Sequence, residues 1–263
     1  MGNMIGRVFR ERKLLSCLSA FRRPRMTTLR KLLLVALLSV NGVCWSQDFS
    51  PAIDAAGLIF DSTALQIRIG NVNSANEGAP NRSGAPAASL GYSPSASVSQ
   101  SVRKEMLANL LASNRDPAAQ SEIKQLFATD EVWREFDRLL SSYGYSSRNL
   151  ADVVAAYYVG AWEIVNYREE VQPRQFKAIR EQLAGTLVTM PDIVNASDAQ
   201  KQQWAESMGM TTALLGSSSA ALLQKGKASE FALLQAQVRQ GMIEYYGIDM
   251  KGLQVTDAGF VMK

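Results

Sequence analysis

The chain has 263 residues, of which 47% are hydrophobic and 20% are charged, and its formal net charge is +4. It contains no histidine, and both of its cysteines, Cys17 and Cys44, lie near its start. Ser-His-Asp catalysis is therefore excluded, and beyond Cys44 so are a cysteine nucleophile and the usual histidine and cysteine ligands of zinc. Walker and G-x-G-x-x-G patterns are also missing, so the sequence carries no phosphate-binding signal. We predict no metal site and no cofactor. The routes left for catalysis use carboxylates, lysine, tyrosine or a hard metal bound by carboxylates.

The sequence pattern of residues 1–46 is typical of a leader that is removed on export. Residues 1–25 are basic and carry little helical or strand pattern, so we expect an upstream extension outside the fold. A positive start, an apolar run over 32–40 and a small residue before Gln47 are typical of a secretory signal peptide. We therefore predict a bacterial Sec-type signal peptide over 26–46, starting near Met26, and a periplasmic or secreted protein.

Removal of this leader reverses the sign of the net charge. Nine of the 28 basic residues and one of the 24 acidic residues precede Gln47, which leaves 19 basic and 23 acidic residues and a net charge of −4. The basic character thus belongs to the leader, and we predict no binding to nucleic acid. The remaining chain has no cysteine and must be stabilised by its core without disulfides.

Two segments separate the leader from the main domain. Residues 47–70 include an alternation of Leu65, Ile67 and Ile69 that is typical of a strand, and we expect an apolar segment that docks on the body or binds a protein partner. Residues 71–100 are rich in serine, alanine, asparagine and proline and nearly free of charge, which predicts a flexible linker.

The rest of the chain, 101–263, is predicted to be a compact all-α domain of several helices. A first helix follows the linker directly. Asp116 and Pro117 form a cap and first-turn pair that opens the second helix. We expect Thr129 or Asp130 to cap a third helix, which ends near Gly144.

The longest helical pattern covers residues 146–167, with Ser147 as its expected N-cap. One side of this helix is apolar and predicted to face the core. The other side carries a stripe of four polar residues, which we take as a tentative binding site or as a solvated or interhelical surface: Asn149, Asp152, Glu163 and Asn166.

Three further helices are predicted. The first is opened by Pro173 and stopped by Pro191, the second starts at Ser197, and the last ends at Gly247. Beyond it, we expect a tail that returns its apolar residues to the core, with a turn near Gly259.

The uncharged stretch 207–224 raises the question of a membrane helix. Its serines, threonines and glycines make it less apolar than a typical span, so we predict no stable span in the chain after the leader. We expect close helix packing there, or a helix break near Gly216.

Three segments together resemble a known family: YGYSSRNLADVVAAYYVGAWEIVN, EQLAGTLVTMPDIVNASDAQKQQWAE and the terminal GIDMKGLQVTDAGF. They are similar to the family catalogued as domain of unknown function 6683, exported proteins of Proteobacteria with a signal peptide, a low-complexity stretch and a helical C-terminal domain. The resemblance covers about residues 97–263 and leaves out the leader and the linker. It implies the fold and export, and assigns no catalytic residue.

Three hypotheses for the function remain. The first is a non-enzymatic exported module that binds a protein partner through its N-terminal segment or its helical body. The second is a glycan or cell-wall hydrolase that uses Glu135, Asp152 or Glu163. Asp152 and Glu163 are eleven residues apart, which places their backbones roughly 16 Å apart on a helix, too far to form a glycosidase pair by themselves.

The third hypothesis is a protein that binds an apolar ligand between its helices. It rests on four aromatic side chains that equally fit a role in the core: Trp133, Tyr157, Trp162 and Trp204.

Overall fold

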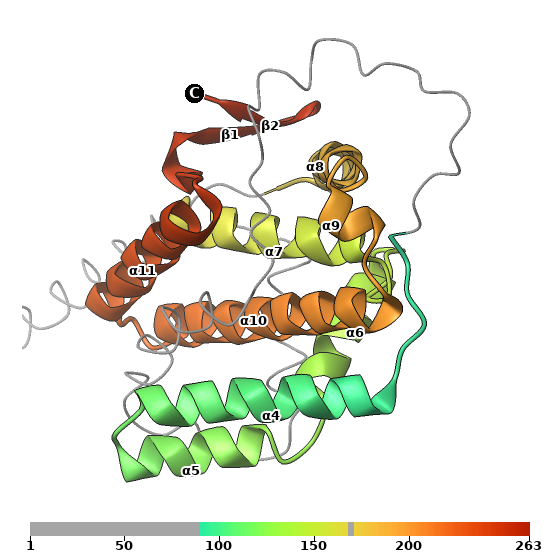
Figure 1. Ribbon diagram of the computed structural model, residues 1–263. Coiled ribbons are helices and arrows are strands. Elements are labelled where there is room, and N and C mark those ends of the chain that lie inside the picture. The colour runs from blue at the N-terminus through green and yellow to red at the C-terminus, as the bar shows by residue number, and fades with distance from the viewer. Residues whose placement is uncertain (1–89, 168–170) are drawn as a thin grey trace, which may run out of the picture.

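The computed structural model describes residues 90–167 and 171–263 (Figure 1). This part of the chain is helical and compact, which confirms the all-α prediction, with one small two-stranded sheet at its C-terminal end. The predictions for 1–25, 26–46, 47–70 and most of 71–100 lie outside the described residues. The helices are α4 (Ala96–Ser113), α5 (Pro117–Leu126), α6 (Glu131–Ser142), α7 (Leu150–Val165), α8 (Pro173–Leu187), α9 (Pro191–Val194), α10 (Asp198–Gln224) and α11 (Ala228–Tyr246).

Helices α7 and α10 form the centre of the body. Figure 1 shows them side by side, with α4 and α5 beyond α10 and α8 beyond α7. Helix α11 contacts both central helices, and α6 packs on α10. Side chains of α7 and α10 therefore meet most of the other elements, and the core runs continuously through the described body.

Helix α7 is buried on all sides, which corrects the prediction of one apolar and one polar face. Of its residues, only Ala156 and Gly160 are more than slightly exposed. The polar side is covered because α8, α11 and the turn after α11 pack against it. At Gly160, an added Cβ would lie 3.4 Å from Thr212 Cγ2, so α7 and α10 approach each other closely there.

The first described residues, 90–100, pack on the helices, although the sequence places them in the linker. Leu90 O accepts a hydrogen bond from Leu150 N at 2.8 Å, and Tyr92 N donates to Arg148 O at 3.1 Å. Both side chains are buried, and α4 already starts at Ala96. Residues 90–100 therefore belong to the packed body.

The start of α7 also differs from the prediction. The N-cap is Asn149, whose side chain accepts a hydrogen bond from Ala151 N at 3.0 Å. Ser147 lies two residues earlier, where it is buried and donates its hydroxyl proton to Asp137. Its backbone oxygen accepts from the Tyr92 hydroxyl at 2.9 Å, so its hydroxyl and its carbonyl are both bonded to groups outside α7.

Most of the other predicted helix ends are confirmed. Asp116 caps α5, and Ser197 and Gln200 form a capping box at the start of α10. Gly144 and Gly247 follow α6 and α11 with positive φ angles. Pro191, however, opens the short helix α9, because α8 has already ended at Leu187.

Helix α10 continues through Gly216, so the predicted break is wrong. Its hydroxyl groups bond to carbonyls one turn earlier in the same helix, as Thr211 does to Ser207 O and Ser218 to Leu214 O, both at 2.8 Å. The polar side chains are thus satisfied within the helix. Within residues 90–167 and 171–263, no helix combines the length and the apolar character needed to cross a membrane.

The C-terminal tail docks on the body as predicted, and it does so as a hairpin. The 3-10 turn η2 (Met250–Gly252) leads into β1 (Leu253–Thr256), which pairs antiparallel with β2 (Gly259–Met262). Leu253 and Phe260 are each 1% exposed. The side chain of Gln182 on α8 accepts from Phe260 N at 2.9 Å and donates to Phe260 O at 3.0 Å, as a neighbouring strand would.

Candidate functional site

The four residues of the predicted polar stripe hold elements together. Asp152 is 5% exposed, and its two carboxylate oxygens accept from Arg180 Nε at 2.8 Å and from Ser146 N at 2.9 Å. It therefore ties α8 and the loop before α7 to the start of α7. Asn149, one turn earlier, caps the same helix.

The other half of the stripe lies at the far end of α7. Glu163 Oε1 accepts from Val171 N at 3.1 Å, at the chain segment that leads into α8. Asn166 donates to Trp162 O at 3.1 Å and to Met250 O at 3.0 Å, which fixes the turn after α11. The structure thus places the stripe in two separate groups, each engaged with neighbouring backbone or side chains.

The remaining candidate acid and the aromatic residues are distributed differently. Glu135 is buried and paired with the exposed Arg138 on the same helix. Tyr157 and Trp162 lie in the core, whereas Trp204 is partly buried against it. Of these residues, Trp133 lines the cleft that is described next. No set of three or more acidic or cysteine side chains in the described part of the chain could hold a metal ion.

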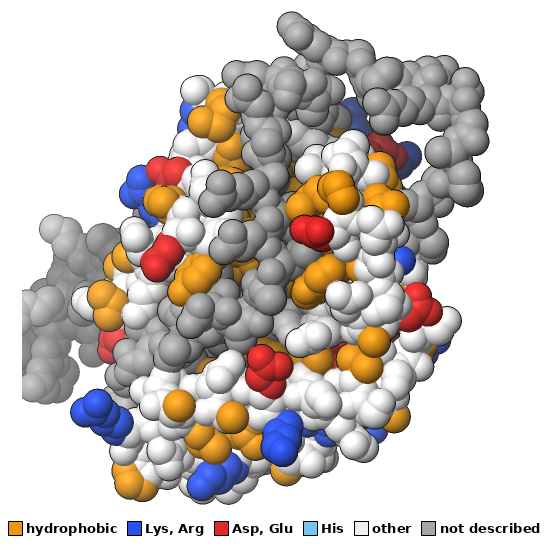
Figure 2. All heavy atoms as spheres, in the orientation of Figure 1, with side chains coloured by type: hydrophobic (Ala, Val, Ile, Leu, Met, Phe, Trp, Pro, Cys, Tyr) orange, Lys and Arg blue, Asp and Glu red, His pale blue; other side chains and the backbone are white. Residues whose placement is uncertain are grey.

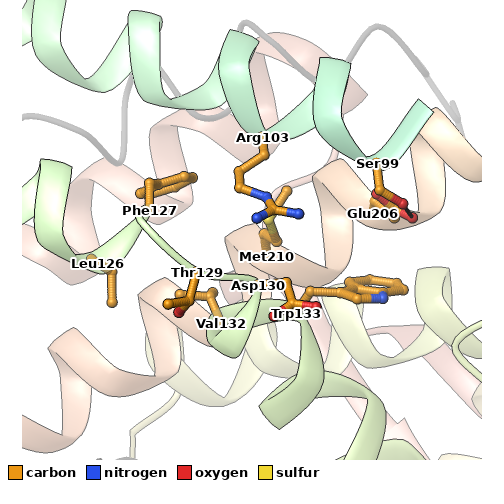
Figure 3. Close-up of a pocket in the computed structure, with 10 residues that line it drawn as sticks. All are labelled: Ser99, Arg103, Leu126, Phe127, Thr129, Asp130, Val132, Trp133, Glu206 and Met210. Atoms are coloured by element: carbon orange, nitrogen blue, oxygen red, sulfur yellow. Dashed lines mark hydrogen bonds between the residues drawn. The ribbon is translucent and has the colours of Figure 1, made fainter. Parts of the chain in front are cut away.

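A cleft opens between α4, the α5–α6 loop and α10 (Figure 3). Its volume is about 60 Å³, and it is open to solvent. Its lining comes from segments about a hundred residues apart: Ser99 and Arg103 on α4, Leu126, Phe127, Thr129 and Asp130 at the end of α5 and in the loop, Val132 and Trp133 on α6, and Glu206 and Met210 on α10.

Helical spacing aims these side chains into the cleft. Ser99 and Arg103 are four residues apart on α4, as are Glu206 and Met210 on α10, so each pair projects from one face of its helix. Figure 3 shows Arg103 reaching into the cleft above Met210, with Trp133 on the opposite side.

A glycine on α10 makes room for the aromatic wall. At Gly209, an added Cβ would lie 2.6 Å from ring atoms of both Trp133 and Phe136, so only glycine lets these rings lie on the helix backbone. The two rings also pack together, with centroids 5.6 Å apart. The position of Trp133 in the cleft is therefore set by its neighbours.

Glu206 is the buried carboxyl of the cleft, with 4% of its surface exposed. Burial raises its pKa above the ordinary value, against the effect of two hydrogen bonds and of the nearby charge of Arg103. Both hydrogen bonds fall on Oε1, from Ser99 Oγ at 2.7 Å and Gln202 Nε2 at 2.8 Å. Burial and the charge of Glu206 in turn raise the pKa of Tyr92.

The other two charged groups of the cleft differ in their pairing. Asp130 forms an ion pair with Arg134 at 2.8 Å. Arg103 is partly buried and, within the described body, makes neither a hydrogen bond nor an ion pair. Its positive charge is therefore the one in the lining that lacks a direct partner.

The sequence pattern did not predict this cleft. Ser99 fell in the predicted linker, and Arg103 and Glu206 are single charged residues whose proximity depends on the packing of α4 on α10. The only local signals were the four-residue spacings. Over the described part of the face in Figure 2, acidic and basic side chains are interspersed, so neither sign of charge dominates that face.

Of the comparisons with known proteins, the one with family models gives a match. The model of a family of unknown function, DUF6683, matches residues 39–263. The match begins well before residue 97, so it includes the linker that the resemblance left out. No curated protein and no solved structure matches the chain. With 39–263 covered by the family model, the chain belongs to the DUF6683 family.

Proposed function

We propose that this protein is a non-enzymatic, exported interaction module, periplasmic or secreted, that binds its partner through the helical body or the N-terminal segment. The observation that carries the proposal is the engagement of every acid considered for catalysis. Asp152 is held by Arg180, Glu163 by Val171 N, and Glu135 by Arg138. A catalytic acid or base needs contact with a substrate, whereas these groups are committed to neighbouring residues.

Export is supported by the sequence pattern over 26–46, which has the basic start, the apolar run and the small exit residue of a signal peptide. The net charge of −4 beyond Gln47 is also compatible with a partner that is not a nucleic acid. N-terminal sequencing of the protein from the export compartment of a bacterial host should find a start near Gln47. A start at Met1 would contradict the proposal of export.

Affinity capture from the export compartment tests the interaction role. The exported full chain and a shorter form covering 90–263 are used as baits, with quantitative comparison to an empty matrix. A partner retained by both baits binds the helical body, and one retained only by the full chain binds the N-terminal segment. Absence of specific partners with either bait would contradict the proposal.

The hydrolase alternative is tested by incubating the protein with purified cell-wall glycan and measuring released reducing ends. We expect no release above background. If the wild-type chain releases reducing ends and a folded Asp152→Asn or Glu163→Gln variant does not, the hydrolase hypothesis is supported.

A further inference from the structure

The cleft between α4, the α5–α6 loop and α10 has the features of a built binding site. Its volume is about 60 Å³, so it is a shallow cleft that can take in part of a small ligand. The wall formed by Phe127, Trp133 and Met210 is apolar. Polar groups reach it at a few defined points, which is the usual arrangement of a ligand site.

From this arrangement, we propose that the cleft binds a carboxylate attached to an apolar group, with Arg103 pairing with the carboxylate and Phe127, Trp133 and Met210 receiving the apolar part. The proposal deepens the interaction function by naming the chemistry that is bound, and it rests on that function in assuming binding without turnover.

The charges in the lining favour a single negative charge. Among the described residues, Arg103 is the cation of the lining without a direct partner, whereas Asp130 is paired with Arg134 and Glu206 accepts from Ser99 and Gln202. The planar guanidinium donates two parallel hydrogen bonds, which match a carboxylate. A dianion such as phosphate is disfavoured, because Asp130 and Glu206 would repel it and only one cation lines the cleft.

The aromatic wall is preorganised for the apolar part. Gly209 and Phe136 hold the ring of Trp133 against α10, so little order has to be created when a ligand enters. Figure 3 shows Arg103 on one side of the cleft and Trp133 on the other, which lets one small ligand touch both.

Two sources share this chemistry: a free apolar acid, and the C-terminal residue of a peptide or protein. Calorimetric titration of the purified full chain separates them with four probes: 3-phenylpropionate, its amide, and a tripeptide ending in phenylalanine with a free or an amidated C-terminus. The carboxylate form of at least one pair should bind about tenfold or more tightly than its amide. Tighter binding of the free peptide points to a peptide terminus, and tighter binding of 3-phenylpropionate to a small acid.

Variants on α4 link the binding to the cleft. Arg103→Gln should weaken binding of the carboxylate by about tenfold or more. Arg103→Lys should keep part of the binding, because lysine retains the positive charge but not the two parallel hydrogen bonds of the guanidinium. Lys104→Gln, at the exposed neighbouring position, is the matched control and should bind as the wild type does. Circular dichroism and melting curves establish that the variants are folded.

Three results would overturn the proposal: no binding of either carboxylate at millimolar concentration, equal binding of carboxylate and amide, or unchanged binding by a folded Arg103→Gln protein. None of them touches the interaction role of the rest of the body, which partner capture tests separately. Partner capture can equally fail while carboxylate binding is observed, so failure of one proposal is distinguishable from failure of the other.

Discussion

The titration of Glu206 should be visible in the stability of the whole protein. Its pKa is raised by burial, with Ser99, Gln202 and Arg103 acting in the opposite direction and Tyr92 also facing it. The native state therefore holds the proton more tightly than the unfolded chain. The stabilisation due to Glu206 is complete below its unfolded pKa of about 4.5 and is lost as the pH rises through the raised native pKa.

Glu206→Gln removes this dependence. Urea unfolding at pH 4.5 and pH 8 should show that the stability of the variant relative to wild type increases at the higher pH, since wild type alone must bury a charge there. Glu244→Gln, on the exposed side of α11, serves as the control. A relative stability that is equal at both pH values would contradict the role of burial.

Asp152 offers a second test at this scale. In Asp152→Asn, the charge that accepts from Arg180 and Ser146 N is lost from a buried site. We expect a loss of about 1.5 to 3 kcal/mol in the free energy of unfolding. Combining it with Arg180→Gln should cost less than the two single changes added together. Strict additivity in urea unfolding would mean that the contact contributes nothing.

At the scale of elements, Gly209 determines how α6 and α10 pack. Gly209→Ala places a Cβ 2.6 Å from the Trp133 and Phe136 rings, so it should lower stability by about 1 to 3 kcal/mol despite its better helix propensity. Gly185→Ala on α8 is the matched control, because nothing lies within 4 Å of its added Cβ, and it should raise stability by about 0.5 to 1 kcal/mol. A thermally neutral Gly209→Ala would show that the rings can move aside freely.

The C-terminal hairpin is the other element with a measurable contribution. Deleting 253–263 removes two fully buried side chains and leaves Trp162 Nε1 without its acceptor, Leu253 O, at 3.1 Å. At about 1.5 to 3 kcal/mol for each buried side chain, the loss should be at least about 3 kcal/mol. Met262→Ala, where the side chain is 56% exposed, should change the melting temperature little. An unchanged melting temperature on deletion would refute the docking of the hairpin.

These elements also show which features the sequence could predict. The caps at Asp116 and Ser197 and the stop at Gly247 depend on residues within one turn, and they are confirmed. The burial of the polar side of α7 depends on contacts with α8, and the hydroxyl of Ser147 bonds to Asp137 on α6 and so does not cap α7. The cleft could not be predicted from local sequence at all, since Ser99 and Glu206 are 107 residues apart and come into contact only in the folded protein.

At the scale of the whole molecule, we expect α7 and α10 to make the described body unfold as one cooperative unit. Most elements contact at least one of these helices, so loss of either removes the support of the others. Calorimetry of a chain covering 90–263 should show one transition, with equal calorimetric and van't Hoff enthalpies. Two separated transitions would show that α4 and α5, or the hairpin, unfold independently.

The pairing of Leu90 and Tyr92 with residues 148–150 has a mechanical consequence. Two backbone hydrogen bonds join residues 90–92 to residues 148–150, at the start of the buried helix α7. A pulling force on the chain before Leu90 would load the Leu90–Leu150 bond first and the Tyr92 bonds after it, because the antiparallel pair opens from one end. These hydrogen bonds would therefore break one after another before such a force acts on the helical core.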